Sequence, residues 1–172
     1  MLLNLETIPH FYKNYVKLIE ETDLIQALRI SGNRAQEILH AIPLERQDFK
    51  YGNDKWTIRE VLCHMIDAER IFAYRSLRFA RNDQTPLAGF DEKTYVPESN
   101  ASGRELKSIL AEMAHLRMAT IDLFSGFNAE MLSRKGLANK NELSVASQGF
   151  IIAGHETHHV KVLTERYFSA WN

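Results

Sequence analysis

The chain has 172 residues, 45% of them hydrophobic, which fits one globular domain with a sizeable buried core. Its 21 lysine and arginine residues nearly balance its 22 aspartate and glutamate residues, which argues against nucleic acid or anionic lipid as a partner. The single cysteine, Cys63, cannot form an internal disulfide, and no signal peptide or membrane-length apolar run is found, so we expect one soluble, cytoplasmic domain over residues 1–172.

Apolar residues at helical spacing organise the first part of the chain. A short helix is expected to begin near Pro9, and a longer pattern predicts a second helix over residues 22–42. Gly32 lies inside that pattern and is expected to weaken the helix locally. The polar stretch over residues 43–55 is predicted to be a connection.

A capping box marks the start of the next long helix. Thr57 is followed three residues later by Glu60, so each side chain can satisfy a backbone N–H at the helix start. The helix is predicted to run to about Arg81. Its inward face is expected to consist of Ile58, Val61, Leu62, Met65, Ala68, Phe72 and Leu77.

The segment over residues 82–100 contains Pro86, Gly89 and Pro97 and is predicted to be a long connection. It is long enough to cross the end of a bundle, and it is also a candidate lid. Ser102 and Glu105 repeat the capping-box pattern and predict the start of a third long helix.

The last helix is predicted from about Ser144 to about Phe168, and no convincing strand pattern is found anywhere in the chain. Four long amphipathic helices need to bury their apolar faces against one another. The sequence therefore predicts an all-α fold, a four-helix bundle with one long crossover between its second and third long helices.

Histidines form the most informative pattern. The segment GHETHHVKV in the last helix contains His155, His158 and His159. At about 100° per residue, His155 and His159 lie within about 40° of each other on the apolar face, whereas His158 falls at its margin. His64 lies on the apolar side of the second long helix and is the predicted third ligand of a metal site.

Three imidazoles would leave open coordination positions, as catalytic metal sites do. Imidazole suits zinc, nickel, iron(II) and copper, so the identity of the divalent metal stays open. Asp67 is a candidate to orient His64 or a bound water, His158 could support a ligand, and Glu69 is a weaker candidate. The alternative is a hydrogen-bonded core histidine, which is the more common role of a lone buried histidine.

The letters HETHH also match the HExxH motif of metalloproteases, in which Glu156 would be the general base. This interpretation is the weaker one, because no further ligand follows and a protease of this class needs a substrate-binding sheet. Cys63 points about 100° away from His64 and is expected to be a packing residue.

Arginines recur every three positions in the second long helix, at Arg75, Arg78 and Arg81. They could guide an anionic substrate, but a solvated helix face is the more frequent explanation for such a row. Trp56 and Phe72 are expected to be packing residues.

Three segments of the chain resemble the DinB-like superfamily, in particular its YfiT branch of metal-dependent hydrolases. They are IPHFYKNYV, KWTIREVLCHMIDAERIFAYRSLRFARNDQTPLAGFDEKTYV and, about ninety residues after His64, GHETHHVKVLTERY. The resemblance implies a four-helix bundle in up-down-down-up order, with His64, His155 and His159 as metal ligands. It also implies a homodimer.

The wider superfamily includes thiol-dependent S-transferases and isomerases, so the resemblance implies either hydrolysis or thiol transfer on a small electrophilic substrate. The expected cofactor is a divalent ion of zinc, nickel or iron, with a low-molecular-weight thiol as a cosubstrate in the second case. A third interpretation is a non-catalytic module, in which the ion only ties two helices together.

Overall fold

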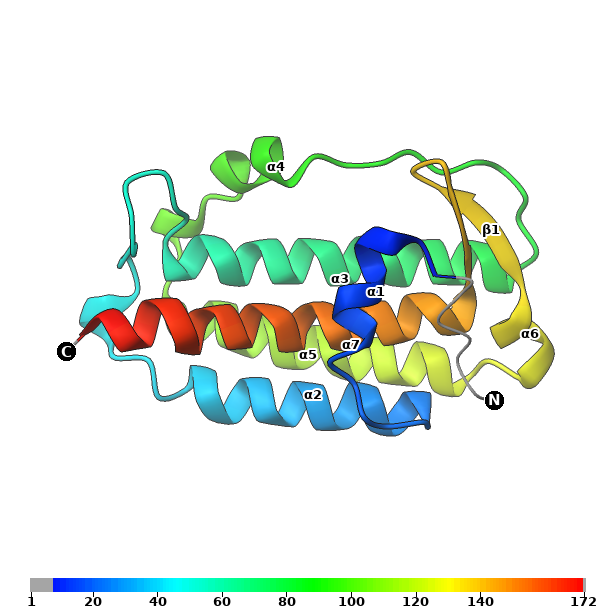
Figure 1. Ribbon diagram of the computed structural model, residues 1–172, viewed down its shortest axis with the longest axis horizontal. Coiled ribbons are helices and arrows are strands. Elements are labelled where there is room, and N and C mark those ends of the chain that lie inside the picture. The colour runs from blue at the N-terminus through cyan, green and yellow to red at the C-terminus, as the bar shows by residue number, and fades with distance from the viewer. Residues whose placement is uncertain (1–7, 172) are drawn as a thin grey trace.

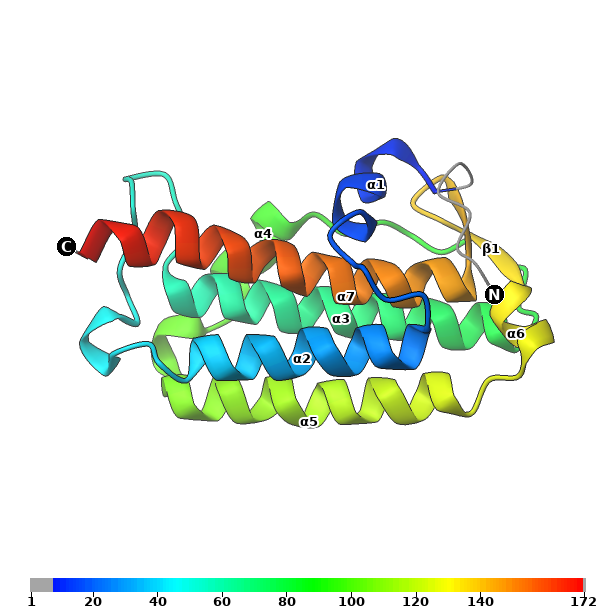
Figure 2. The same cartoon turned by 60° about the horizontal axis from the view of Figure 1, so that its bottom comes forward.

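Four long helices form a bundle in the computed structural model, which describes residues 8–171 (Figure 1). They are α2 (Leu24–Leu39), α3 (Ile58–Ala80), α5 (Leu106–Ser125) and α7 (Val145–Val162). Helices α3 and α5 run in one direction and α2 and α7 in the other (Figures 1 and 2). Each long helix packs against two others, in the cyclic order α2, α7, α3, α5. The predicted all-α bundle in up-down-down-up order is confirmed.

Side-chain caps fix the starts of three of these helices, and the cap of α2 is Asp23. Thr57 and Glu60 form the predicted capping box of α3, and Ser144 caps α7 by accepting a hydrogen bond from the Ser147 N–H. The capping box predicted for the third long helix is wrong. Ser102 lies in a separate 3₁₀ turn, and α5 begins after Glu105, whose side chain makes no cap hydrogen bond.

The connection between α3 and α5 returns along the length of α3 and carries the short helix α4 (Glu92–Glu98) (Figure 1). We expected a segment that crosses one end of the bundle. Because α3 and α5 run in the same direction, the chain must instead travel back over the whole helix before α5 can begin. Helix α4 packs against α3 on the way.

A β-hairpin at one end of the bundle contradicts the expectation of no strands. After the short helix α6 (Ala129–Ser133), strands β1 (Lys135–Ala138) and β2 (Asn141–Ser144) pair antiparallel. Both turn residues, Asn139 and Lys140, have positive φ values of 48° and 62°, as tight hairpin turns require. The sequence pattern missed it because each strand has only four residues and the turn lacks glycine.

The hairpin is tied to its neighbours. Gly136 of β1 lies against the Phe79 ring of α3, where a Cβ atom would overlap that ring. The crossover joins the hairpin through two backbone hydrogen bonds, from the Leu87 N–H to the Leu137 carbonyl and from the Asn139 N–H to the Leu87 carbonyl. These contacts hold the hairpin beside the end of α3.

Helix α1 (His10–Val16) is the short helix predicted near Pro9, and it packs on α7. The contact is close because α7 has Gly154 at this point. A Cβ atom there would overlap the Tyr15 carbonyl group. The glycine therefore lets the α1 backbone lie directly on α7, which brings Tyr12 and Tyr15 over the bundle.

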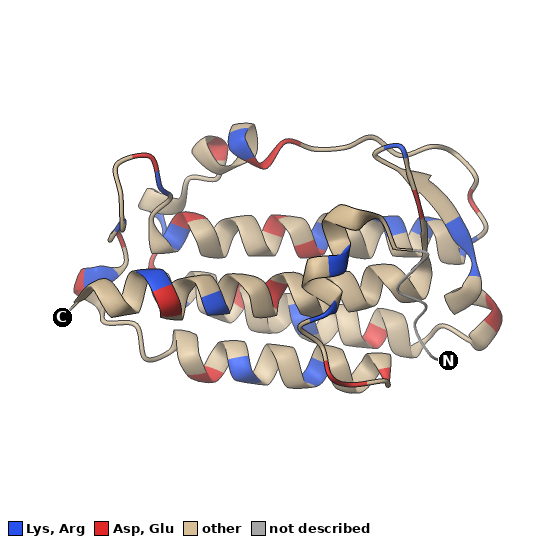
Figure 3. Cartoon of the chain, in the orientation of Figure 1, with Lys and Arg blue, Asp and Glu red and all other residues tan. Residues whose placement is uncertain are grey.

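Apolar side chains fill the bundle in two clusters. Leu28, Phe124 and Ile151 are buried in the cluster nearer the hairpin, and Leu62 and Leu163 in the other. Acidic and basic residues are interspersed along the helices (Figure 3). None of the helices within residues 8–171 is long and apolar enough to cross a membrane.

Candidate metal centre

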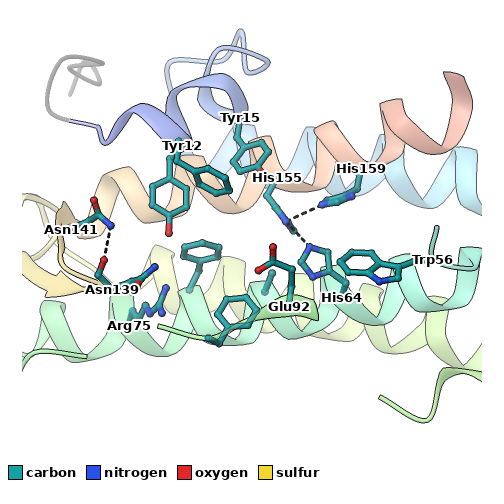
Figure 4. Close-up of a pocket in the computed structure, with 14 residues that line it drawn as sticks. Tyr12, Tyr15, Trp56, His64, Arg75, Glu92, Asn139, Asn141, His155 and His159 are labelled. Carbon is teal, nitrogen blue, oxygen red and sulfur yellow. Dashed lines mark hydrogen bonds between the residues drawn. The ribbon is translucent and has the colours of Figure 1, made fainter. Parts of the chain in front are cut away.

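The structure brings His64, His155 and His159 together (Figure 4). His64 comes from α3, and the other two come from successive turns of α7. The Nε2 atom of His155 lies 3.1 Å from Nε2 of His64 and 3.1 Å from Nε2 of His159. One ring nitrogen from each residue falls within 4.8 Å of the other two. The two helix faces thus aim three imidazoles at one point.

Burial keeps these rings uncharged. Desolvation lowers the pKa of His64, and it lowers the pKa of His155 well below the ordinary histidine value. For His159, burial and then the neighbouring His64 and His158 lower the pKa to about 3. At neutral pH all three side chains are therefore neutral imidazoles, the form that binds a metal ion.

Mutual hydrogen bonds cannot satisfy this arrangement. The His155 Nε2 atom carries either one proton or one lone pair, so it can make one good hydrogen bond, yet it faces two other nitrogens at 3.1 Å. A shared cation would accept all three lone pairs. Nitrogens that bind one tetrahedral zinc ion at roughly 2.0 to 2.1 Å lie about 3.3 to 3.4 Å apart. The three residues therefore fit a divalent ion.

The histidines open onto a cavity of about 390 Å³ that is lined by aromatic side chains from several elements. The Trp56 ring lies 5.1 Å from the His64 ring between centroids, and the Tyr15 ring meets the His155 ring edge-on at 5.3 Å. These contacts hold the imidazoles in place. Trp56 and Phe72, which were predicted to be packing residues, thus also line the candidate site.

Glu92 of α4 lines the same cavity and was not predicted. Its carboxylate is close enough to His64 that its charge opposes the desolvation that lowers the pKa of that ring. The residue is half-buried. Its sequence surroundings carry no helical periodicity, so only the suggestion that the crossover could serve as a lid pointed toward it.

Asp67 does not join the cluster. Its charged neighbours are Arg70, Glu112 and Arg104, and burial raises the pKa of its carboxyl. No hydrogen bond connects it to His64 among the residues that the structure describes. Asp67 follows His64 by three residues, so its side chain leaves α3 about 60° away from that of His64, toward α5. The structure therefore shows no contact through which Asp67 would support His64 as predicted.

Glu156, the glutamate of HETHH, is committed to a buried ion pair. Its Oε2 accepts a hydrogen bond of 2.6 Å from Nη1 of Arg117 on α5. Arg117 also donates to both carboxylate oxygens of Glu69, at 3.0 and 2.8 Å, and to Ser31. A glutamate held in this way cannot act as the general base of a metalloprotease, so the structure argues against that interpretation.

His158 and Cys63 lie where the sequence placed them. His158 is half-buried at the margin, with its ring 5.1 Å from those of Tyr15 and His159 between centroids, and it is not part of the cluster. Cys63 is buried, and desolvation raises the pKa of its thiol. It does not line the cavity, which agrees with a packing role.

The three arginines of α3 differ from one another. Arg78 pairs with Asp83, and Arg81 is exposed beside the Phe127 ring. Arg75 is only 3% exposed and lines the cavity. The expectation of a solvated arginine face is therefore wrong for Arg75.

Known proteins are similar to this chain in sequence and in fold. The family model described as the DinB superfamily matches residues 27–163. In sequence, the chain is similar to a protein of Oceanobacillus iheyensis named as a candidate metal-dependent hydrolase, with 25% identity over 132 residues that make up 74% of each chain.

Two solved structures are also similar. YfiT from Bacillus subtilis, described as a candidate metal-dependent hydrolase with an unusual four-helix bundle topology, gives a TM-score of 0.75 at 19% identity, over 86% of this chain and 85% of YfiT. A mycothiol-dependent maleylpyruvate isomerase gives a TM-score of 0.66 at 10% identity, over 92% of this chain and 62% of the isomerase. At identities as low as these, the similarity shows only that this chain and the two solved structures have the same fold.

Proposed function

The chain belongs to the DinB superfamily, and from that premise we propose that it is a metal-dependent enzyme acting on a small electrophilic substrate. In this proposal His64, His155 and His159 hold one divalent ion of zinc, nickel or iron. The observation that carries it is the meeting of three neutral imidazole nitrogens, from the buried His64 and His155 and the half-buried His159, at the wall of a cavity of about 390 Å³. The names of two relatives as candidate metal-dependent hydrolases support the same proposal.

A divalent ion in this site would supply Lewis acidity, which lowers the pKa of a bound water or thiol. The side chains around it have separate tasks. The three imidazoles would bind the ion, and the rings of Trp56 and Tyr15, which pack on His64 and His155, would shield it from bulk water. A carboxylate oxygen of Glu92 accepts the proton that the nucleophile loses, since this residue lines the same cavity.

Water and a thiol are both possible nucleophiles. Hydrolysis agrees with the names of the sequence relative and of YfiT. Thiol transfer agrees with the name of the mycothiol-dependent isomerase. The only cysteine of the chain does not line the cavity, so in the second reaction the thiol would come from a separate low-molecular-weight molecule.

Replacing His155 with Ala tests the metal site. Elemental analysis of the purified protein should find about one ion per wild-type chain and almost none in the variant, while circular dichroism shows the helices retained. His158→Ala is the matched control, because His158 lies on the same helix outside the cluster, and it should keep the ion. Full metal occupancy in His155→Ala would refute the assignment.

Screens with activated esters, and with electrophiles plus a thiol, then separate the two reactions. Turnover that needs no thiol identifies a hydrolase, and turnover that needs one identifies a transferase. A protein that binds metal, loses stability with chelator and turns over neither set is the non-catalytic module. The homodimer, the cytoplasmic location and the identity of the ion stay predictions.

A further inference from the structure

Arg75 lies in the same cavity as the histidines, at its other end (Figure 4). Arg75 follows His64 by eleven positions along α3. This spacing is about three helical turns, so the two side chains leave the helix within about 20° of each other, with Cα atoms about 16 Å apart. One face of α3 thus carries a metal ligand at one end of the cavity and a cation at the other.

Within residues 8–171, the Arg75 guanidinium is buried without a carboxylate partner. Of the three buried arginines, Arg59 pairs with Asp48, and Arg117 pairs with two glutamates. Arg75 forms no ion pair within residues 8–171. Its Nη2 donates to the Ala88 carbonyl at 2.8 Å, and its guanidinium lies 5.6 Å from the centre of the Phe72 ring.

Neutral hydrogen-bonding groups surround Arg75 at this end of the cavity. The Tyr12 hydroxyl lies beside the guanidinium, and the hairpin contributes Asn139 and Asn141 (Figure 4). The Asn141 side chain donates to the Asn139 carbonyl at 2.7 Å, which fixes the two residues relative to each other. Asn139 also lies against Gly89 of the crossover. The groups around the cation are thus held by α1, the hairpin and the crossover.

We propose that Arg75 and these neutral groups bind a carboxylate of the substrate, so that the enzyme acts on elongated molecules with an anionic end and an electrophilic centre. A buried guanidinium without a counter-ion is costly, and a carboxylate matches its paired N–H donors. One cation among neutral donors, with the Glu92 carboxylate in the same cavity, suits a monoanion better than a doubly charged phosphate. The electrophilic centre rests on the proposed function, whereas the anion site does not.

A matched pair of probes tests the proposal by calorimetry. 4-Phenylbutyrate and the uncharged 4-phenylbutyramide share one shape, and the acid should bind wild-type protein at least tenfold more tightly. Arg75→Met keeps the packing against Phe72 but removes the charge. It should weaken binding of the acid by about ten- to a hundred-fold and leave the affinity for the amide unchanged. Arg81→Met is the control, because Arg81 is exposed on the same helix.

The same titrations are repeated after metal removal, because a carboxylate could also bind the ion. The proposal is overturned if the Arg75→Met variant still prefers the acid over the amide, whether or not chelation then abolishes that preference. Equal binding of the acid and the amide by the wild-type protein also overturns it. The side-chain N–H signals of Arg75 in wild-type protein give an independent result if the variant does not fold. They should shift with the acid and not with the amide. Metal content and turnover are measured separately, so the anion site can stand if the metal site fails.

Discussion

Arg117 lies between Glu69 and Glu156 and binds both carboxylates inside the bundle. One guanidinium thus joins α5 to α3 and α7, and it also donates to the Leu28 carbonyl of α2. Gly32 of α2 packs directly against the Arg117 side chain, where a Cβ atom would be too close to it. The glycine that the sequence marks as a weak point of its helix therefore makes room for the arginine.

Replacing Arg117 with Met is expected to destabilise the protein by about 3 to 5 kcal/mol, because two buried carboxylates lose their partner. Urea denaturation monitored by circular dichroism measures the change. Lys161→Met removes a cation from the exposed pair with Glu165 and should change the free energy of unfolding by no more than about 0.5 kcal/mol. Equal stability of the two variants would contradict the role given to Arg117.

The residues of the candidate site differ in how far the sequence could predict them. His64, His155 and His159 were predictable because helical periodicity places each on an apolar face. Arg75 and Glu92 were not predictable, because what buries or positions them comes from distant segments. Arg75 belongs to a row of three arginines with one spacing, and only contacts from α1, the hairpin and the crossover distinguish it from Arg81.

At the scale of elements, α3 and α7 follow their local signals closely. The capping box at Thr57 predicted the start of α3, and its observed end at Ala80 is one residue before the predicted one. Helix α7 ends at Val162, but a π-helical segment continues it to Tyr167, near the predicted end at Phe168. The hairpin was missed because four-residue strands are too short to show alternation.

Gly154 controls how closely α1 can approach α7. Gly154→Ala should force α1 outward and destabilise the protein by about 1 to 3 kcal/mol, because the new methyl group meets the backbone at Tyr15. Thermal denaturation measures the loss of stability, and NMR should show the signals of Tyr15 and His155 moving together.

Gly126→Ala is the control for this prediction. Gly126 follows α5 with a φ of −79°, and a Cβ atom there would be in ordinary contact, 3.5 Å from the nearest atom. We expect the free energy of unfolding of this variant to be within about 0.5 kcal/mol of the wild-type value. If both glycine variants lose the same stability, the close contact with α1 is not what requires a glycine at position 154.

At the scale of the whole molecule, the candidate metal centre connects α3 and α7. We expect chelation to lower the melting temperature, because an ion bound only by the folded protein stabilises it by about 2.7 kcal/mol at a hundred-fold excess over its dissociation constant. Differential scanning calorimetry with and without chelator measures this effect. The His155→Ala variant should not respond to chelator, and a response of equal size would place the stabilising ion elsewhere.

The order of the four helices is the part of the fold that periodicity does not determine. Four amphipathic helices can pack in several arrangements, and only the resemblance to a known superfamily implied the up-down-down-up order. That order requires the long crossover, and the crossover brings Glu92 to the histidines. The topology of the bundle and the composition of the cavity are therefore linked.

His64 and His155 are 91 positions apart, yet their ring nitrogens nearly touch. An incomplete chain that lacks α7 has one of the three imidazoles and no enclosed place for a cation. During synthesis on the ribosome, the growing polypeptide therefore cannot assemble this trio until its final long helix has emerged. An ion held as proposed would then be bound late, and only the finished bundle would select it.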